Sequence, residues 1–175
     1  MDLARALSLI RPIPDYPKPG ILFQDITPLL ADPRAFATVV DAIAALDKQA
    51  DFAVGIEARG FILASAVALR NEIGFVPIRK KGKLPAHTYS RAYGLEYGED
   101  VVEIHSDAFT AGAKVVLIDD VLATGGTLEA AIGLVRDAGA HISSIVTLLE
   151  ISQLGGRDRI GKIAPGVPIH ALVTL

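Results

Sequence analysis

The segment from Val115 to Thr127, VVLIDDVLATGGT, combines two kinds of chemistry in a short stretch. An apolar run ends in two adjacent carboxylates, Asp119 and Asp120, and a glycine pair flanked by threonines follows. If the apolar run is a strand and a helix begins at Gly126 or Thr127, the turn between them presents unpaired backbone N–H groups at the positive end of the helix dipole. Glycines let an anion approach those amides, so this half of the segment suits a phosphate monoester.

The two carboxylates need a different partner, because they would repel a phosphate. A bound Mg²⁺ or a pair of neighbouring hydroxyl groups would satisfy them, and a sugar diol beside a phosphate satisfies both halves of the segment. Taken singly, an Asp before a helix is often only a cap, and Gly-Gly is often only a turn. The ordered set on a strand, a turn and a helix instead favours a ribose phosphate site.

Two other nucleotide-binding interpretations lack their main element. The segment VVLIDD also resembles the Mg²⁺-binding strand of nucleotide triphosphatases. The sequence has no G-x-x-x-x-G-K-[ST] motif, however, and no G-x-G-x-x-G follows a predicted strand. The sequence therefore argues against a P-loop and against a dinucleotide-binding fold.

The composition limits the class of protein. The 175 residues, 51% of them hydrophobic, suffice for one core but not for two domains of usual size. A formal net charge of -3 gives no general attraction to nucleic acid or to anionic membranes. The absence of cysteine excludes disulfides and thiolate metal sites and fits a reducing compartment. The longest apolar run, residues 61–69, is far shorter than the roughly 20 residues of a membrane span, so we expect a cytoplasmic protein.

The elements that must position this chemistry alternate along the chain. Apolar runs predict strands at residues 52–56, 75–79, 115–119, 144–149 and about 167–172. Helical spacing predicts helices that follow Asp32-Pro33 and that span residues 60–71 and 125–137. Strands that are apolar on both faces and alternate with helices indicate an α/β fold with a central, mostly parallel sheet flanked by helices.

Two regions interrupt this alternation. Residues 11–30 are rich in proline, and residues 80–98 are rich in Lys, Arg, Tyr and Gly without a strong period. Ligands of open α/β sheets gather at the carboxyl ends of the strands, and irregular insertions commonly form the walls of such sites. We therefore expect both regions to border the site.

Five segments together resemble a known enzyme family. VVLIDDVLATGGT is similar to the phosphoribosyl pyrophosphate signature of type I phosphoribosyltransferases. PDYPKPGILFQDITPLL, GIEARGF, RKKGKLP and GLEYG, which begin at residues 14, 55, 79 and 94, occur in the order found in its adenine-specific members. The resemblance spans nearly the whole chain and implies one phosphoribosyltransferase domain over residues 1–175. Residues 1–30 or so would form a small N-terminal hood over the base, and residues 80–105 or so a flexible catalytic loop and hairpin.

The resemblance implies a reaction. The 5-phosphoribosyl group of phosphoribosyl pyrophosphate would pass to N9 of adenine, giving AMP and pyrophosphate, with Mg²⁺ held mainly by substrate and water. It also implies a homodimer, with no nucleic acid or membrane as partner. Two alternatives stay open: the same transfer to another purine, and a non-catalytic regulator that senses phosphoribosyl pyrophosphate. Such regulators tend to lose the catalytic loop, which this chain retains.

The resemblance assigns the sugar phosphate to the signature segment. The 5-phosphate would be held by the amides and hydroxyls of Ala123, Thr124, Gly125, Gly126 and Thr127, and the diol would be bound by Asp119 and Asp120. Consecutive strand residues point to opposite faces, so we expect the strand to turn already at the acids. Nearby carboxylates would also stabilise the oxocarbenium character that the ring gains as the bond at C1 breaks.

The pyrophosphate is assigned to two segments. In GIEARGF a cis peptide between Glu57 and Ala58 would present amides to the leaving group, and Arg59 would pair with its oxygens. A solvated helix start is the alternative for Arg59. The cations of the run from 79 to 83, Arg79, Lys80, Lys81 and Lys83, would add counter-charge, some of it to a neighbouring subunit, although most such runs are simply solvated loops.

The remaining assignments concern the base. Glu96, with Tyr97 beside it in the flexible loop, would accept the proton that adenine loses, and loop closure would exclude water. An ordinary hairpin tip with a solvated Glu96 is the alternative. Phe23 would stack on the purine while the backbone of Leu22 and Gln24 reads its edge. Many family members carry Arg in place of Gln24, so base preference depends on whether that side chain takes part. Without the family, Phe23 would be interpreted as a core residue.

Overall fold

The computed structural model describes residues 1–95 and 98–175, and the chain divides into two compact units, Met1–Ala45 and Leu46–Leu175. The first unit contains α1 (Leu3–Leu7), β1 (Arg11–Pro14), β2 (Leu22–Asp25), α2 (Thr27–Ala31) and nearly all of α3 (Pro33–Leu46). The strands β1 and β2 pair antiparallel. Helix α3 begins where predicted, because the Asp32 carboxylate accepts hydrogen bonds from the amides of Arg34 and Ala35, both at 2.9 Å.

The second unit is built on a sheet. Its elements are β3 (Phe52–Ile56), α4 (Arg59–Asn71), β4 (Gly74–Lys80), β5 (Thr88–Leu95), β6 (Gly98–His105), β7 (Lys114–Leu122), α5 (Gly126–Asp137), β8 (His141–Glu150), the short 3-10 helix η1 (Ser152–Leu154), α6 (Gly156–Ile163) and β9 (Ile169–Thr174). Within the described residues, seven strands form one sheet in the order β5-β6-β4-β3-β7-β8-β9. The five strands β4, β3, β7, β8 and β9 are each parallel to their neighbours in this group. Strand β6 is antiparallel to both of its neighbours, β4 and β5. The predicted α/β fold with a mostly parallel sheet is confirmed.

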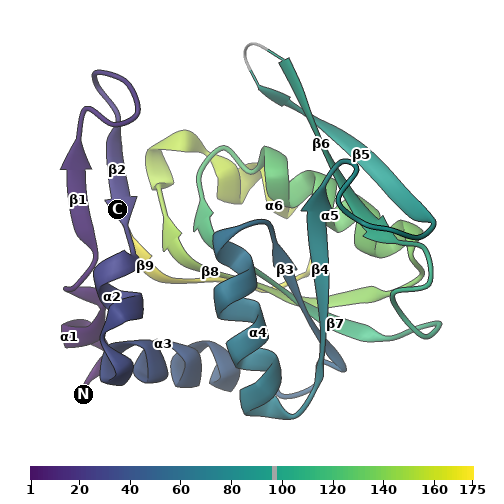
Figure 1. Ribbon diagram of the computed structural model, residues 1–175, viewed down its shortest axis with the longest axis horizontal. Helices are drawn as coiled ribbons and strands as arrows, with labels where there is room; N and C mark the ends of the chain where they lie inside the picture. Colours follow the sequence, from purple (N-terminus) through teal and green to yellow (C-terminus); the bar gives the residue numbers. More distant parts are fainter. Residues whose placement is uncertain (96–97) are drawn as a thin grey trace. The chain divides into compact units, whose positions relative to one another are not determined.

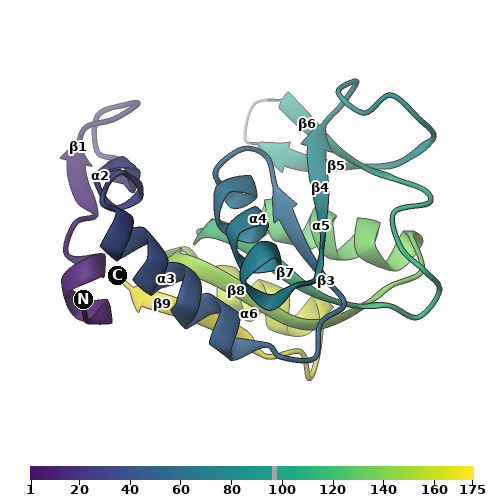
Figure 2. The ribbon, with the colours of Figure 1, turned by 60° about the horizontal axis from the view of Figure 1, so that its bottom comes forward.

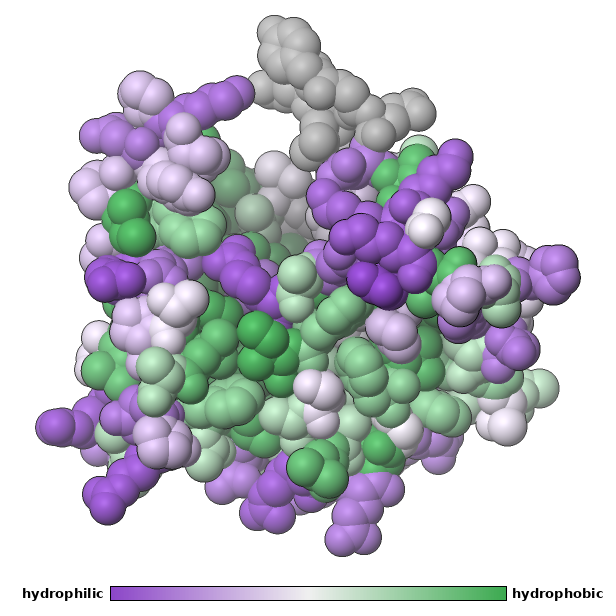
Figure 3. Space-filling model, in the orientation of Figure 1, coloured by the Kyte–Doolittle hydropathy of each residue, from purple (hydrophilic) through white to green (hydrophobic). Residues whose placement is uncertain are grey.

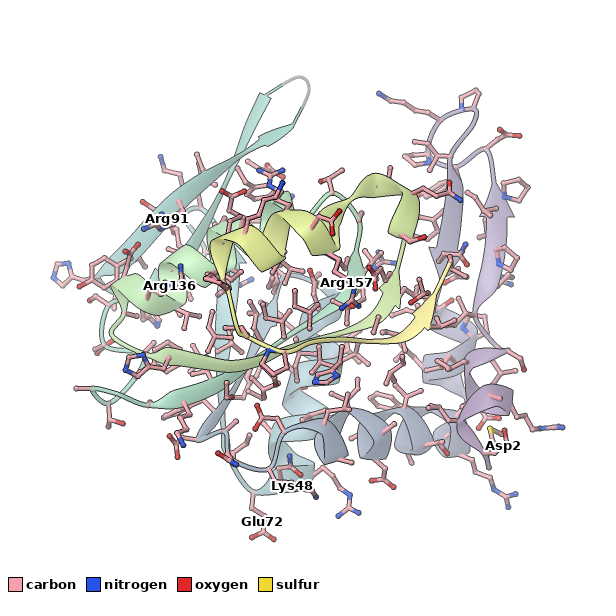
Figure 4. All side chains as sticks on the ribbon, turned by 180° about the vertical axis from the view of Figure 1, so that it is seen from behind. Asp2, Lys48, Glu72, Arg91, Arg136 and Arg157 are labelled. Carbon is pink, nitrogen blue, oxygen red and sulfur yellow. The ribbon has the colours of Figure 1, made fainter. Side chains whose placement is uncertain are left out.

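Helices cover both faces of this sheet. Figures 1 and 2 show α4 on one face, and Figure 4, seen from behind, shows α5 and α6 on the other. Alternate residues of β7, Val115 and Leu117, pack in one buried cluster with Leu128 and Ile132 of α5. This burial fixes the ends of β7 and α5, which carry the signature segment. None of the helices that the structure describes is both long and apolar enough to cross a membrane.

The predicted strands and helices are all present, and the largest boundary errors are the end of β7 and the start of β8, which were predicted at residues 119 and 144. The predicted helices at 60–71 and 125–137 differ from α4 and α5 by one residue at their starts. Strand β7, however, does not end at Asp119: it pairs with β8 as far as Leu122, opposite Glu150. Val121 and Leu122 continue the apolar run, and Leu122 is buried. The irregular region after residue 80 forms the paired strands β5 and β6, and α1, β1, β2, α2 and α6 had no predicted counterpart.

Candidate active site

A pocket of about 350 Å³ lies at the carboxyl ends of β3 and β7, which are parallel neighbours in the sheet. It is lined by Glu57, Ala58, Arg59, Lys80, Tyr93, Asp119, Asp120, Val121, Ala123, Thr124, Gly125, Gly126, Thr127 and Leu128. Most of the residues predicted to bind the sugar phosphate and the pyrophosphate are thus brought together. Tyr93, Val121 and Leu128 line the pocket without having been predicted.

The turn between β7 and α5 forms a cradle of backbone amides, residues Ala123 to Thr127. Gly125 has φ 82°, a left-handed conformation that glycine adopts without strain, and it is the N-cap of α5. A glycine N-cap has no side chain to compete for the first amides of the helix. These amides lie at the positive end of the helix dipole, so the cradle is suited to a phosphate group.

The acids at the end of β7 are buried and only partly neutralised. Asp119 is 8% exposed and Asp120 5% exposed. Oδ2 of Asp120 lies 2.7 Å from Nη2 of Arg59, and Oδ1 of Asp119 accepts a hydrogen bond of 2.9 Å from the Asp120 amide. Burial raises the pKa of both carboxyls; the Asp120 charge raises the pKa of Asp119 further, while Arg59 opposes the rise at Asp120. Hydroxyl donors from a ligand would satisfy these oxygens.

Both acids line one pocket although the strand does not turn between them. The expected turn at this point is wrong, since pairing with β8 continues through Asp119 to Leu122. Both acids can line the pocket because it extends from Arg59 at the start of α4 to Leu128 in the first turn of α5. These helices lie on opposite faces of the sheet, so residues that point to either face reach the same volume.

Glu57 contacts cationic residues at the end of β4 and in the loop that follows it. The peptide bond between Glu57 and Ala58 is cis, as expected. Oε1 of Glu57 lies 2.7 Å from Nζ of Lys83, and its Oε2 accepts a 2.9 Å hydrogen bond from the Lys80 amide and lies 3.4 Å from Nε of Arg79. Burial alone would raise the pKa of Glu57, but the Lys83 and Lys80 hydrogen bonds outweigh it and hold that pKa below its usual value. Arg79 and Lys83 therefore lie at Glu57, and Lys80 lines the pocket.

Tyr93 on β5 is the main residue that sequence reasoning missed. Its hydroxyl donates a 3.2 Å hydrogen bond to Oδ2 of Asp100 on β6, which also lies 3.1 Å from Nζ of Lys80. Burial and the Asp100 charge raise the pKa of Tyr93. Alternating residues in TYSRAYGL, with Tyr89 and Tyr93 on one face, were an available signal for a strand.

The other predicted residues lie elsewhere. Glu96 and Tyr97 fall outside the described residues. Leu22, Phe23 and Gln24 form most of β2 in the first unit, where Leu22 is exposed and Phe23 is only partly buried. Phe23 is thus neither fully buried nor fully exposed, so its assignment to the base or to a core stays a prediction. Its ring contacts that of Tyr16 edge to face, with centroids 5.2 Å apart.

Within residues 1–95 and 98–175, no group of three or more His, Cys, Asp or Glu side chains could hold a metal ion. Asp119 and Asp120 are the carboxylates that line the pocket together with Glu57. Their oxygens are the kind of ligand that Mg²⁺ accepts alongside substrate and water. The donor set thus fits an ion that arrives with a phosphorylated substrate.

Comparison with known proteins identifies the family. A model of the phosphoribosyl transferase domain matches residues 26–164. An adenine phosphoribosyltransferase of Streptomyces coelicolor is 53% identical over 171 residues, which cover 97% of this chain and 94% of that protein. One from Parvibaculum lavamentivorans is 56% identical over 153 residues, covering 86% and 87%.

Solved structures agree. The crystal structure of an adenine phosphoribosyltransferase from Thermoanaerobacter pseudethanolicus has a TM-score of 0.90 and 45% identity, covering 99% of both chains. That of the Giardia lamblia enzyme with 9-deazaadenine has a TM-score of 0.92 and 38% identity, covering 100% of this chain and 98% of that one. The sheet, its helices and the signature turn define the type I phosphoribosyltransferase class. The chain belongs to this family, in its adenine phosphoribosyltransferase branch.

Proposed function

We propose that the protein transfers the 5-phosphoribosyl group of phosphoribosyl pyrophosphate to N9 of adenine, giving AMP and pyrophosphate in purine salvage. The observation that carries this proposal is the single pocket shared by the buried acids of β7 and the amides at the start of α5. A phosphorylated pentose has hydroxyls for the first and an anion for the second. Relatives named as adenine phosphoribosyltransferases, one of them crystallised with 9-deazaadenine, support adenine as the acceptor.

The sugar phosphate would span the two halves of the signature segment. Amides and hydroxyls of residues 123–127 hold the 5-phosphate, and Asp119 and Asp120 accept the diol hydroxyls. Hydrogen bonds to a charged group contribute about 1.5–3 kcal/mol each, so the acids anchor the sugar firmly. With the diol bound there, the same carboxylates would lie near the positive charge that develops on the ring as the bond at C1 breaks, and they would stabilise the transition state more than the ground state.

The leaving group would be held by the loop after β3. Ala58, Arg59 and Lys80 line the pocket, where the Ala58 amide and the two cations would hold the pyrophosphate. Glu57 acts on these cations by holding Lys83 and Arg79 in place. Bound Mg²⁺, carried by substrate and water beside the acids, would neutralise part of the charge of the departing pyrophosphate.

The backbone of β2 suits the recognition of a base. The register pairs Pro12 with Gln24 and Pro14 with Leu22. Proline has no N–H to donate, so in an antiparallel ladder these are the pairs that exchange no hydrogen bonds. The N–H and C=O groups of Leu22 and Gln24 therefore point away from β1, and in this proposal they read the edge of the base. Recognition through the main chain makes the Gln24 side chain tolerable where relatives of the family carry Arg.

We assign the proton transfer to Glu96, with Tyr97 beside it. A carboxylate near N9 accepts the proton that adenine loses and returns it in the reverse direction. The change Glu96→Gln is expected to lower kcat far more than it weakens substrate binding. Equal kcat values for the two proteins would leave Glu96 without a role in the chemistry.

We also propose a homodimer that works in the cytoplasm. Ile62, Leu69 and Phe75 expose 40%, 83% and 37% of their surface. Ile62 and Leu69 lie on α4, and hydrophobic side chains gather on the face that this helix presents in Figure 3. Exposed apolar groups of this kind favour an interface between subunits. Sedimentation at several concentrations tests it, and a monomer throughout would refute it.

One assay tests the reaction. Pyrophosphate release is measured with adenine, hypoxanthine, guanine and xanthine in turn, each with phosphoribosyl pyrophosphate, and with Mg²⁺ present or chelated. We expect turnover that requires both adenine and Mg²⁺. Preference for hypoxanthine or guanine would favour the alternative acceptors. Binding of phosphoribosyl pyrophosphate without any turnover would favour the non-catalytic regulator.

A further inference from the structure

Arg159, on α6, brings a positive charge to the beginning of α5. A Cβ atom added to Gly126 would lie 3.7 Å from Nη1 of Arg159, and one added to Gly125 would lie 3.4 Å from its Cδ. Helix α6 lies this close because its first residue, Gly156, packs directly on the carbonyl oxygen of Ala123. The guanidinium therefore borders the amide cradle, on the side of a second groove of about 510 Å³ lined by Gly126, Tyr93 and Arg159 itself.

The partner of Arg159 is Glu129, in the first turn of α5. Nε of Arg159 donates a 2.6 Å hydrogen bond to Oε2 of Glu129, and its Nη2 lies 2.5 Å from the same oxygen. Two of the three guanidinium nitrogens are thus engaged. Among the side chains that the structure describes, which exclude those of residues 95–99, none accepts a hydrogen bond from Nη1, and Nη1 is the nitrogen closest to Gly126.

Glu129 places a negative charge near the amides that would bind a phosphate, and Arg159 neutralises that charge. An acid in the first turn stabilises a helix on its own, because it faces the positive end of the dipole. It repels a phosphate dianion bound at the same amides. The two side chains are 48% and 42% exposed, and ion pairs of that exposure contribute little to stability. Their placement is better explained by the charge that they present to the cradle.

We propose that Arg159 is a further binding residue for the 5-phosphate: its guanidinium cancels the charge of Glu129 and directs Nη1 toward the phosphate. The inference rests on the proposed function, because it takes the cradle to be the site of the 5-phosphate. Arg159 contacts no reacting atom, so its effect falls on affinity. The ligand group that it recognises is a phosphate monoester on a ribose.

Binding of AMP and of adenosine, measured by calorimetry, isolates the phosphate. Arg159→Gln is expected to weaken AMP binding about fivefold and Glu129→Gln to strengthen it about threefold, both with adenosine unchanged. Arg159→Lys keeps the charge and retains most of the affinity. Arg136→Gln is the matched control, because it removes the same charge from the last turn of α5, where Figure 4 labels Arg136.

Opposite signs for the two Gln variants, with near-normal AMP affinity in the double variant, would support the proposal. Weaker AMP binding in both would show that the pair is only structural and would overturn it, as would an Arg159→Gln protein that binds AMP like the Arg136→Gln protein. Glu129→Gln carries the test even if Arg159→Gln folds poorly, since melting temperatures are recorded for each. A wild-type protein that binds AMP no better than adenosine would overturn the proposed function itself, a result that these variants cannot mimic.

Discussion

Glu57 and the pair Asp119–Asp120 are acids at the carboxyl ends of two neighbouring parallel strands, β3 and β7, yet their surroundings differ. Glu57 meets two cationic side chains and the Lys80 amide, and its pKa is lowered. The two Asp residues share one cation, Arg59, within the described residues, and burial raises the pKa of both. Glu57 is thus satisfied by the protein, whereas the Asp pair has fewer partners in the protein and is the pair that we propose binds the ligand.

This difference gives the two regions opposite pH dependence. A lowered pKa stabilises the fold above the usual carboxyl pKa of about 4, and this is lost as the pH falls through the folded value. A raised pKa has the opposite effect: the contribution of that carboxyl to stability is fully present below about pH 4 and is lost as the pH rises through the folded value. At neutral pH, Glu57 therefore stabilises the unliganded protein and the Asp pair destabilises it.

The largest expected effect is that of Asp120→Asn. An amide has fewer acceptor lone pairs and no charge, so both the diol contact and the stabilisation of the transition state weaken. We expect pyrophosphate release to fall about a hundredfold or more, with an unchanged circular dichroism spectrum. Near-normal turnover would remove the diol assignment and with it the contrast between the two acid regions.

A second substitution moves an acid without changing any charge. A Cβ atom on Gly60 would lie 2.9 Å from Oδ1 of Asp119 and 3.0 Å from the Ile118 carbonyl oxygen. Gly60→Ala is expected to lower kcat/KM about thirtyfold, because small displacements at a catalytic site are costly. Gly161→Ala, in α6 with nothing within 4 Å of the new Cβ, is the control and should leave kcat/KM unchanged. Equal activities would show that the position of Asp119 is not critical.

The sequence predicted the elements whose burial is local and periodic. Strand β3 was placed correctly because every residue from Ala53 to Ile56 is buried, which produces a continuous apolar run. The signature turn was found because glycine at Gly125 is required by its left-handed backbone. These features depend on neighbours within a few residues, so the sequence displays them directly.

Contacts between distant segments could not be predicted in this way. Glu57 and Lys83 are 26 residues apart, and Glu129 and Arg159 are 30 apart, so no spacing rule connects them. The end of β7 was misplaced because Leu122 is extended by pairing with β8, a partner far along the chain. The opposite pKa shifts of the acids depend on such pairings, so they could not be predicted from the sequence either.

Glu57→Gln tests the acid whose partners are supplied by the protein. Loss of the anion frees Lys83 and Arg79, which no longer hold the ordered arrangement beside the pocket. We expect KM for phosphoribosyl pyrophosphate to rise about tenfold with little change in kcat.

Asp47→Asn is a matched control. Asp47 also has a lowered pKa, because hydrogen bonds from Ser143, Ser144 and two amides outweigh its burial. It precedes β3 and so lies at the opposite end of that strand from Glu57. That variant should melt lower with KM unchanged, and an equal rise in KM would show that Glu57 acts only through stability.

The smallest effect is on stability and concerns Asp119→Asn. The amide oxygen keeps the hydrogen bond from the Asp120 amide, while a buried charge disappears. Because the folded pKa of Asp119 is raised, the ionised carboxylate destabilises the unliganded protein above that pKa, and the variant should melt about 2–4 °C higher at pH 8, the shift expected for about 1 kcal/mol. Near pH 4 the wild-type carboxyl is protonated and the two melting temperatures should converge.

The melting temperature of Glu57→Gln should shift in the opposite direction at pH 8, since the Glu57 carboxylate stabilises the fold there. An Asp119→Asn protein that melts lower than wild type at pH 8 would mean that Asp119 is already satisfied within the fold, as Glu57 is.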